Sequence, residues 1–336
     1  MKSLRAQNEK LNKEYVRVML QYLIILLDDT STSYCHYENT RTTHKLIPLD
    51  ILKAGIKFGM MENLMIQFVY PDFQLPLEYK KAIESIDHNN IVSSLCEDKE
   101  VLAVADVTIF HDWSGIVYAN LDKEKCYALR TTKDDLFERY LFLKDVLSKV
   151  ARLNVIITDI ETFKEEDFLK YNQVLHVLSA QVEKLYADDI MPQLNILTDR
   201  MMLSQMNNCG AAESNITLAP NGKFYVCPAF YYENESKNAG DLEHGLEIKN
   251  KHLYKLDYAP ICTNCDAYQC KRCIWLNRKT TLEVNTPSHE QCVVAHMERN
   301  ASRKLLQKIG KCKNPLLQDF IEEMDYLDPF EKYQKI

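Results

Sequence analysis

The sequence predicts an α/β protein, a partial barrel of six β/α units followed by a cysteine-rich domain and C-terminal helices. Two observations support this. From about residue 16 to 206, apolar runs alternate with amphipathic stretches of helical length, which is typical of a mostly parallel sheet covered by helices. Seven of the eleven cysteines then fall within residues 207–296, where no long amphipathic helix is expected. A closed eight-unit barrel would need roughly 250 residues, so we expect the barrel to be open.

The elements follow in order. The expected strands are residues 22–27, 64–70, 104–110, 126–130, 153–158 and 194–197. The clearest helices are residues 48–62, 133–150 and 165–186, and Pro48 suits a first helical turn because its missing N–H costs little there. In the cysteine-rich part, Asn221-Gly222 predicts a hairpin over residues 216–226. Two helices, residues 294–309 and 315–326, are expected after it.

This order divides the chain into four parts. They are an N-terminal extension (1–15), the partial β/α barrel (16–206), the cysteine-rich domain (207–296) and the C-terminal helices (297–336).

Composition excludes two classes of partner. The 41 Lys and Arg are scattered among 48 Asp and Glu, giving a net charge of −7, so nucleic acid is not expected. The longest early apolar run, residues 18–27, is too short for a membrane span and ends at Asp28. It also lacks a signal-peptide cleavage site, so we expect a cytoplasmic protein that does not bind membranes. In that compartment clustered cysteines bind metal more often than they form disulfides.

Two CxxC pairs, Cys262/Cys265 and Cys270/Cys273, carry the strongest chemical signal. A CxxC turn lets two thiolates converge on one centre, which is why such pairs recur in iron–sulfur and zinc sites. Four cysteines alone would suit zinc equally well, but seven exceed one zinc site. Cys209 and Cys227 flank the expected hairpin, whose Asn-Gly turn brings the two ends of the segment near one another, and this indicates a second centre.

The series formed by Cys209, Gly222, Cys227, the double CxxC and Cys292 resembles the SPASM domain of radical S-adenosylmethionine peptide-maturing enzymes, which holds one or two auxiliary [4Fe–4S] clusters. The resemblance implies two ligand sets. One is Cys262, Cys265, Cys270 and Cys292, and the other is Cys209, Cys227 and Cys273, completed by Cys312 or a substrate sulfur. The spacings after Cys265 and after Cys270 are each one residue shorter than in the family, so the choice between Cys270 and Cys273 stays open.

The first domain lacks both halves of that family's cofactor signature. In the loop after the first strand, Cys35 occupies the second position of the CxxxCxxC motif, while Ser31 and Glu38 occupy the first and third. Residues 68–72 read Phe-Val-Tyr-Pro-Asp where a Gly-Gly-Glu-Pro-like motif is expected. One thiolate cannot hold the radical cluster, so S-adenosylmethionine binding is not supported.

Over the whole chain, Cys35-His36-Tyr37 and residues 197–202, 207–210 and 222–230 resemble the CXXX repeat peptide maturase family. This resemblance implies an enzyme that matures a ribosomally made, Cys-rich precursor peptide, with or without a partner maturation protein. Two alternatives stay open. One is a non-catalytic protein that binds or delivers the peptide, and the other is a binding module stabilised by zinc.

Candidate catalytic groups are few, and each has a structural alternative. Cys35 with His36 and Glu38 forms either a thiolate site or a buried remnant loop. The acidic candidates follow expected strands, where ligand-binding groups of β/α folds collect, and each could equally be a cap or half of an ion pair. They are Asp28, Asp29, Asp159 with Glu161, and Asp199 with Arg200. We expect His289 and His296 to be structural, and Cys96, Cys126 and Cys312 to be free thiols.

Overall fold

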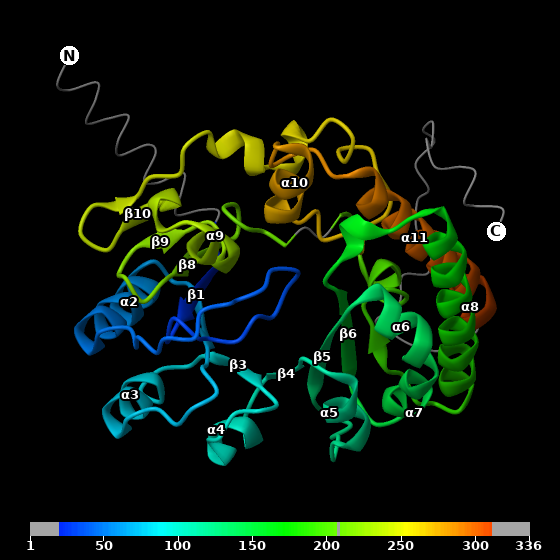
Figure 1. Cartoon of the computed structure of the whole chain (residues 1–336), viewed down its shortest axis with the longest axis horizontal. Helices are drawn as coiled ribbons and strands as arrows, with labels where there is room; N and C mark the ends of the chain where they lie inside the picture. The colour runs from blue at the N-terminus through cyan, green and yellow to red at the C-terminus, as the bar shows by residue number, and fades with distance from the viewer. Residues whose placement is uncertain (1–19, 207–208, 311–336) are drawn as a thin grey trace.

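The computed structural model describes residues 20–206 and 209–310, and it is built on one nine-stranded sheet (Figure 1). The strand order is β7-β6-β5-β4-β3-β2-β1-β8-β9, and every neighbouring pair is parallel except β8 and β9. The strands are β1 (Tyr22–Leu26), β2 (Met65–Val69), β3 (Asn89–Ser93), β4 (Val107–Phe110), β5 (Cys126–Thr131), β6 (Arg152–Ile157), β7 (Gln193–Leu194), β8 (Asn215–Leu218) and β9 (Phe224–Tyr225).

The helices are α2 (Leu49–Met61), α3 (Leu77–Ile83), α4 (Lys99–Ala103), α5 (Trp113–Tyr118), α6 (Lys133–Arg139), α7 (Leu143–Leu147), α8 (Glu165–Ala187), α9 (Pro228–Glu233), α10 (Ile274–Thr281) and α11 (His289–Ile309). Most of the helices cover the outer face of this sheet, whereas α10 and the start of α11 lie on the cavity side. The sheet is curved, with β1, β8 and β9 on the left of Figure 1, β5 and β6 on the right, and β3 and β4 below. The segment that contains α10 spans the open top.

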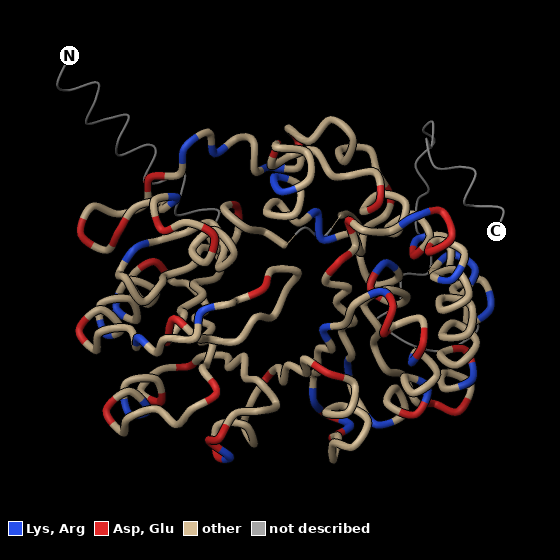
Figure 2. The backbone as a smooth tube through the Cα atoms, in the orientation of Figure 1, with Lys and Arg blue, Asp and Glu red and all other residues tan. Residues whose placement is uncertain are grey.

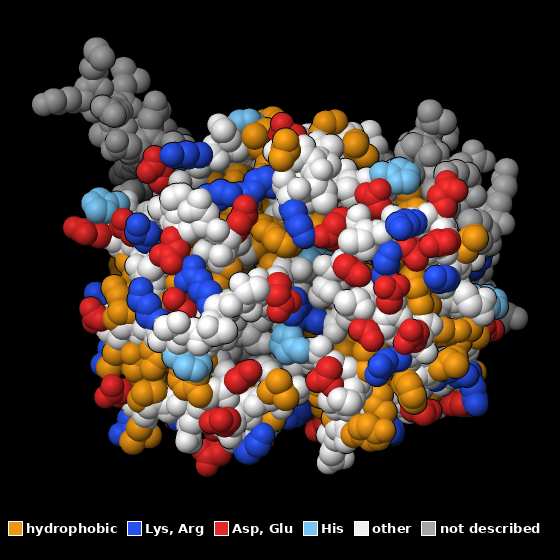
Figure 3. All heavy atoms as spheres, viewed as in Figure 1, with side chains coloured by type: hydrophobic (Ala, Val, Ile, Leu, Met, Phe, Trp, Pro, Cys, Tyr) orange, Lys and Arg blue, Asp and Glu red, His pale blue; other side chains and the backbone are white. Residues whose placement is uncertain are grey.

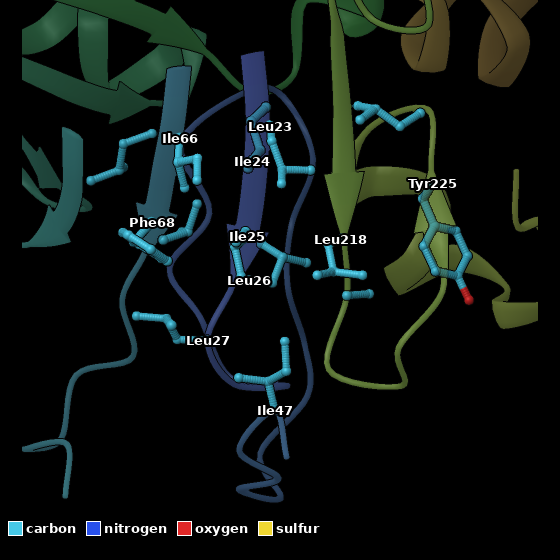
Figure 4. Packing of buried hydrophobic residues seen from close by; sticks show 14 of the residues in the cluster. Leu23, Ile24, Ile25, Leu26, Leu27, Ile47, Ile66, Phe68, Leu218 and Tyr225 are labelled. Carbon is cyan, nitrogen blue, oxygen red and sulfur yellow. The ribbon is translucent and has the colours of Figure 1, made fainter. Parts of the chain in front are cut away.

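Strand β1 lies at the centre of the hydrophobic core, between β2 and β8 (Figure 4). Its residues from Leu23 onward are buried, as expected for a parallel strand covered on both faces. Leu23 and Ile25 face α2, where Gly55 and Gly59 allow a close approach. A methyl group at Gly59 would lie 2.7 Å from Ile66 Cδ1, so α2 packs nearer to the sheet than an alanine would permit.

The long apolar strands and the helices 48–62 and 165–186 are confirmed within a few residues. Strand β3 was missed because only Ile91 and Val92 in it are aliphatic. The strand expected at 194–197 is limited to Gln193–Leu194. The single helix expected over 133–150 was wrong: a 3₁₀ turn at Tyr140–Phe142 divides it into α6 and α7.

The cysteine-rich segment contributes to the main sheet. The expected hairpin is present as β8 and β9, with Gly222 at φ +76° in its turn, which suits glycine. Strand β8 also pairs with β1, so the sheet runs across residue 206. The helix expected at 294–309 starts earlier, at His289, and carries Cys292 in its first turn. Residues 1–15, the helix expected at 315–326 and Cys312 lie outside the described residues.

Charge is distributed without a dominant sign. Lys and Arg alternate with Asp and Glu along the backbone in Figure 2, and the face in Figure 3 shows both signs among scattered hydrophobic side chains. Among helices of the described residues, none is long and apolar enough to cross a membrane.

Candidate metal and peptide site

The strands enclose a cavity of about 560 Å³. Alternation along β1 decides which side chains face it: Tyr22 and Ile24 line the cavity, while Leu23 and Ile25 pack on α2. Residues 269–275 and the first turns of α11 close it from the other side. Amide side chains are prominent in the lining, namely those of Gln67, Asn154, Asn195, Asn215, Gln269 and Gln291.

One group of thiols consists of Cys262, Cys265, Cys270 and Cys292, and we call it the rim thiols; Cys270 is the member that also lines the cavity. Burial raises the pKa of Cys292, and the other three rim thiols raise it further. Burial likewise raises the pKa of Cys270 to about 12; the Arg272 N–H opposes this, while Cys262 and Cys265 add to it. The four thiols are therefore close enough to act on one another electrostatically.

A second group lines the cavity itself, and we call it the cavity thiols: Cys35, Cys209, Cys227 and Cys273. Burial raises the pKa of Cys273 well above its ordinary value, and the other three cavity thiols raise it further. Burial raises the pKa of Cys227 in the same way, with added contributions from Cys209 and Cys35. The backbone N–H of Cys209 donates to the Lys271 carbonyl at 2.9 Å, which fixes Cys209 beside the second CxxC turn.

Backbone N–H groups are directed at several of these sulfurs. Cys227 immediately precedes α9, and the N–H groups of Ala229 and Phe230 act against burial to lower its pKa. Cys273 likewise immediately precedes a helix, α10. In the rim group, the Ala267 N–H donates to Cys265 Sγ at 3.5 Å. Such N–H···S contacts stabilise thiolates and are one of the means by which proteins tune iron–sulfur clusters.

The second CxxC pair is split between the two groups. Cys270 stands with the rim thiols and Cys273 with the cavity thiols. Between them Arg272 has a φ of +43°, a left-handed conformation that is uncommon for a side chain of this size. This turn directs the two sulfurs of one CxxC pair toward different sets.

The loop that carries Cys35 is fixed by contacts from several parts of the fold. Arg130, at the end of β5, donates from Nε to the Cys35 carbonyl at 3.0 Å and from Nη2 to the Tyr37 carbonyl at 2.6 Å. The ring Nδ1 of His36 lies 2.9 Å from the Ile157 carbonyl. The Tyr37 ring stacks on Tyr232 of α9 with centroids 5.6 Å apart. The position of Cys35 is therefore set by two strands and by the helix that follows Cys227.

The positions that would complete a radical-cluster motif are occupied by side chains with structural contacts. Ser31 Oγ donates to the Val69 carbonyl at 2.8 Å. Glu38 Oε2 accepts from Arg130 Nη2 at 2.7 Å. Both side chains hold the loop in place.

The four acidic candidates at strand ends do not come together, and none lines the cavity. Asp28 is buried and accepts from the Thr30 N–H at 2.8 Å. Asp29 pairs with Arg41 at 3.0 Å.

The other two are also engaged. Asp159 Oδ1 accepts the Lys133 N–H at 2.8 Å, and burial raises its pKa. Asp199 pairs with Arg152 at 2.7 Å. The hydrogen bond from Lys133 gives Asp159 a structural role, and the ion pair with Arg152 gives Asp199 one.

The neighbouring candidates have partners of their own. Glu161 pairs with Lys279, and Arg200 with Asp266 at 3.3 Å. His296 Nε2 lies 3.5 Å from Cys265 Sγ, whereas His289 is directed toward Glu290. Within residues 20–206 and 209–310, no three His, Cys, Asp or Glu side chains are gathered closely enough to hold a single metal ion.

Sequence reasoning missed two residues of this site, Arg130 and Glu298. Arg130 lies at the end of an expected buried strand, and a charge in such a strand is itself a sign that a buried partner exists. Nothing in the sequence pointed to Glu298. It lies within a predicted helix, and the apolar periodicity of that helix does not show which face lines the cavity.

Glu298 predicts a pH dependence of stability. Burial raises its pKa from the ordinary 4.5 to about 7, against the hydrogen bonds donated by Tyr171 and Gln269. The unfolded chain thus releases this proton near pH 4.5, while the folded chain holds it to about pH 7. The unfolding free energy is expected to fall as pH rises through this window, by about 1–3 kcal/mol more than in Glu298→Gln. Urea unfolding of the reduced apoprotein at several pH values measures the difference.

The matched control is Glu183→Gln on the exposed side of α8. The unfolding free energy of this variant should change with pH in the same way as that of wild type. Equal pH dependence in wild type and Glu298→Gln would contradict the prediction.

No family model matches the chain, and no curated protein sequence matches it. Solved structures do. Polyhistidine-tagged anSMEcpe with bound AdoMet has a TM-score of 0.58 at 12% identity, covering 88% of this chain and 97% of that chain. Native anSMEcpe with bound AdoMet and Cp18Cys peptide has a TM-score of 0.56 at 12% identity, covering 86% and 98%.

Streptococcus suis SuiB bound to precursor peptide SuiA is 13% identical and covers 80% of this chain and 74% of that chain, but its TM-score of 0.45 is too low for an argument. The two anSMEcpe structures show that most of this chain has their α/β fold.

Proposed function

We propose that the protein matures a ribosomally made, Cys-rich peptide of the CXXX repeat type and carries [4Fe–4S] clusters on thiols of its SPASM-like segment. The observation that carries the proposal is the presence of five cysteines on the lining of one cavity, in a fold shared with a structure that contains a bound peptide; they are Cys35, Cys209, Cys227, Cys270 and Cys273. The rim thiols would hold one cluster. Cys209, Cys227 and Cys273 would hold the other.

The donor set fits such clusters. Thiols predominate in both groups and suit iron–sulfur centres, with His296 Nε2 3.5 Å from Cys265 Sγ in the rim group. Backbone N–H groups are directed at Cys227 and Cys265. Four thiolates around a cubane stand farther apart than four around one zinc ion, because each binds a different iron. The raised thiol pKa values fit as well, since thiols buried together remain protonated until a metal centre compensates their charge. When bound, a cluster would bind a substrate thiolate or transfer electrons.

The cavity would hold the peptide. Its volume lies within the range usual for ligand sites, roughly 300–1,000 Å³. The side-chain amide of Gln67 can pair with the backbone of an extended segment, and apolar lining residues such as Trp275 can contact its side chains. The chain's own residues would thus bind and orient the peptide beside the cavity thiols and exclude water from it.

A metal assay tests the clusters. Anaerobically purified wild type is expected to contain more than four irons per chain, with matching sulfide and little zinc. Cys262→Ala/Cys265→Ala should lose roughly four irons and keep the rest. Cys126→Ala, which removes a thiol outside both groups, should match wild type. Zinc alone in the wild type would refute the proposal and support the zinc-stabilised module.

The contacts of Ser31 and Glu38 favour a second candidate function, a non-catalytic protein that delivers the peptide to another maturation enzyme. Both side chains hold the loop in the place where a radical cluster would need thiolates. The peptide's mass, measured after incubation with the protein, AdoMet and a reductant, separates the two functions. A mass change that requires the intact rim thiols supports the maturase, whereas tight binding with unchanged mass supports delivery.

A further inference from the structure

We propose that Cys35 is the fourth thiolate of the second cluster, together with Cys209, Cys227 and Cys273. This inference rests on the proposed function, because it completes a centre proposed there. The sequence left that fourth ligand to Cys312 or to a substrate sulfur. The structure offers a thiol of the first domain in its place.

Location is the first argument. All four cavity thiols line the same cavity, although Cys35 follows β1 and the others come from the cysteine-rich segment. The backbone N–H of Cys209 donates to the Lys271 carbonyl at 2.9 Å, which places Cys209 beside the turn that carries Cys273. Strand β1, which leads to Cys35, pairs with β8, which lies between Cys209 and Cys227 in the chain. Cys35 therefore stands with the thiols of the cavity group.

Positioning is the second argument. A ligand that closes a cluster must be held in place, because a mobile thiol would lose entropy on binding. The Cys35 carbonyl is bound by Arg130 Nε at 3.0 Å, and the ring of Tyr37 stacks on Tyr232 of α9, the helix that begins directly after Cys227. The loop is thus docked on the element that presents another of the four thiols.

Charge is the third argument. A cubane bound by four thiolates is an anion, so nearby cations stabilise it. Two cations lie close to the Cys35 thiol: the Arg130 guanidinium donates to the Cys35 carbonyl at 3.0 Å, and Lys271 lines the cavity together with Cys35. Lys271 also lies between the two cysteines of the second CxxC pair, and its carbonyl accepts the Cys209 N–H. Ligation would exchange the S–H bond of Cys35 for an S–Fe bond and release one proton.

A consequence concerns the substrate. With Cys35 bound, every iron of the second cluster has a protein thiolate, and no site remains open for a peptide sulfur. The loop that resembles a radical-cluster loop would then serve the auxiliary centre. A substrate thiol could reach this cluster only by displacing Cys35.

The test compares anaerobically reconstituted wild type, Cys35→Ala and Cys35→Ser by iron and sulfide content and by EPR. Wild type is expected to hold roughly eight irons. Cys35→Ala should keep the cluster of the rim thiols and lose iron from the second cluster. If one iron is lost, mild oxidation should give a [3Fe–4S] EPR signal; otherwise all four irons of that cluster should be lost. Cys35→Ser, whose oxygen can bind iron weakly, should retain more iron than Cys35→Ala and shift the reduction potential.

Control variants distinguish failure of this inference from failure of the proposed function. Cys126→Ala should match wild type, and circular dichroism of the apoproteins should show that Cys35→Ala folds. Full iron content with unchanged EPR and potential in Cys35→Ala would overturn this inference and leave the two-cluster proposal standing. Wild type with four irons or fewer would overturn both.

Discussion

Replacement of Asp266 by alanine should destabilise the protein by roughly 3–5 kcal/mol, the largest effect that we expect from one side chain. Asp266 is 2% exposed and binds two buried guanidinium groups. Its Oδ1 lies 2.9 Å from Arg299 Nη1, and its Oδ2 lies 3.3 Å from Arg200 Nη2. Removal of the carboxylate leaves two buried positive charges without this counterion, and that cost exceeds the net value of the ion pairs themselves.

Denaturant unfolding of the reduced apoprotein measures this loss. Asp257→Ala, an exposed carboxylate of the same segment, is the matched control and should stay within about 0.5 kcal/mol of wild type. Because Asp266 follows Cys265 directly, the variant should also hold less iron at the rim thiols. An unfolding free energy equal to that of Asp257→Ala would show that the two arginines find other counterions.

Arg130→Ala is expected to cost about 2–4 kcal/mol, because it leaves the carbonyls of Cys35 and Tyr37 without their charged donor. Arg130 is 5% exposed and donates to the carbonyls of Cys35 and Tyr37 and to Glu38. Its loss should release the loop after β1. Hydrogen exchange of residues 33–39 should rise, and the iron content should fall toward that of Cys35→Ala.

Two variants make this prediction specific. Arg139→Ala removes an exposed arginine of α6 and should change neither the hydrogen exchange of residues 33–39 nor the iron content. Arg130→Lys keeps the charge but cannot reproduce the forked hydrogen bonds, so it should fall between wild type and Arg130→Ala. Arg130→Ala with wild-type exchange in residues 33–39 would contradict a positioning role.

The sequence predicted elements where local composition determines the structure. The apolar run of β1 and the amphipathic pattern of α8 are strong local signals, and both elements are present. Strand β3 has only two aliphatic residues, and its place in the sheet depends on β2 and β4 beside it. The helix break at Tyr140–Phe142 leaves Leu141 and Phe142 half exposed. The apolar pattern of the sequence places such residues in the core, so it could not predict the break.

The chemistry of the site stays a prediction, and its assembly was predictable only in part. The double CxxC predicts that the cysteine-rich segment binds metal. The position of Cys35 beside Cys209 depends on the pairing of β8 with β1, a contact between strands far apart in the chain. No spacing in the sequence encodes such a contact, so the resemblance to maturases left the fourth ligand open.

That pairing has a consequence for synthesis of the chain. A ribosome releases β1 first, but β8 follows only after six other strands have emerged. Until then, one side of an almost wholly apolar segment offers unpaired N–H and C=O groups to any other nascent or misfolded polypeptide. Aggregation therefore competes with completion of the sheet during translation, and chaperones that shield this side should improve recovery of native protein.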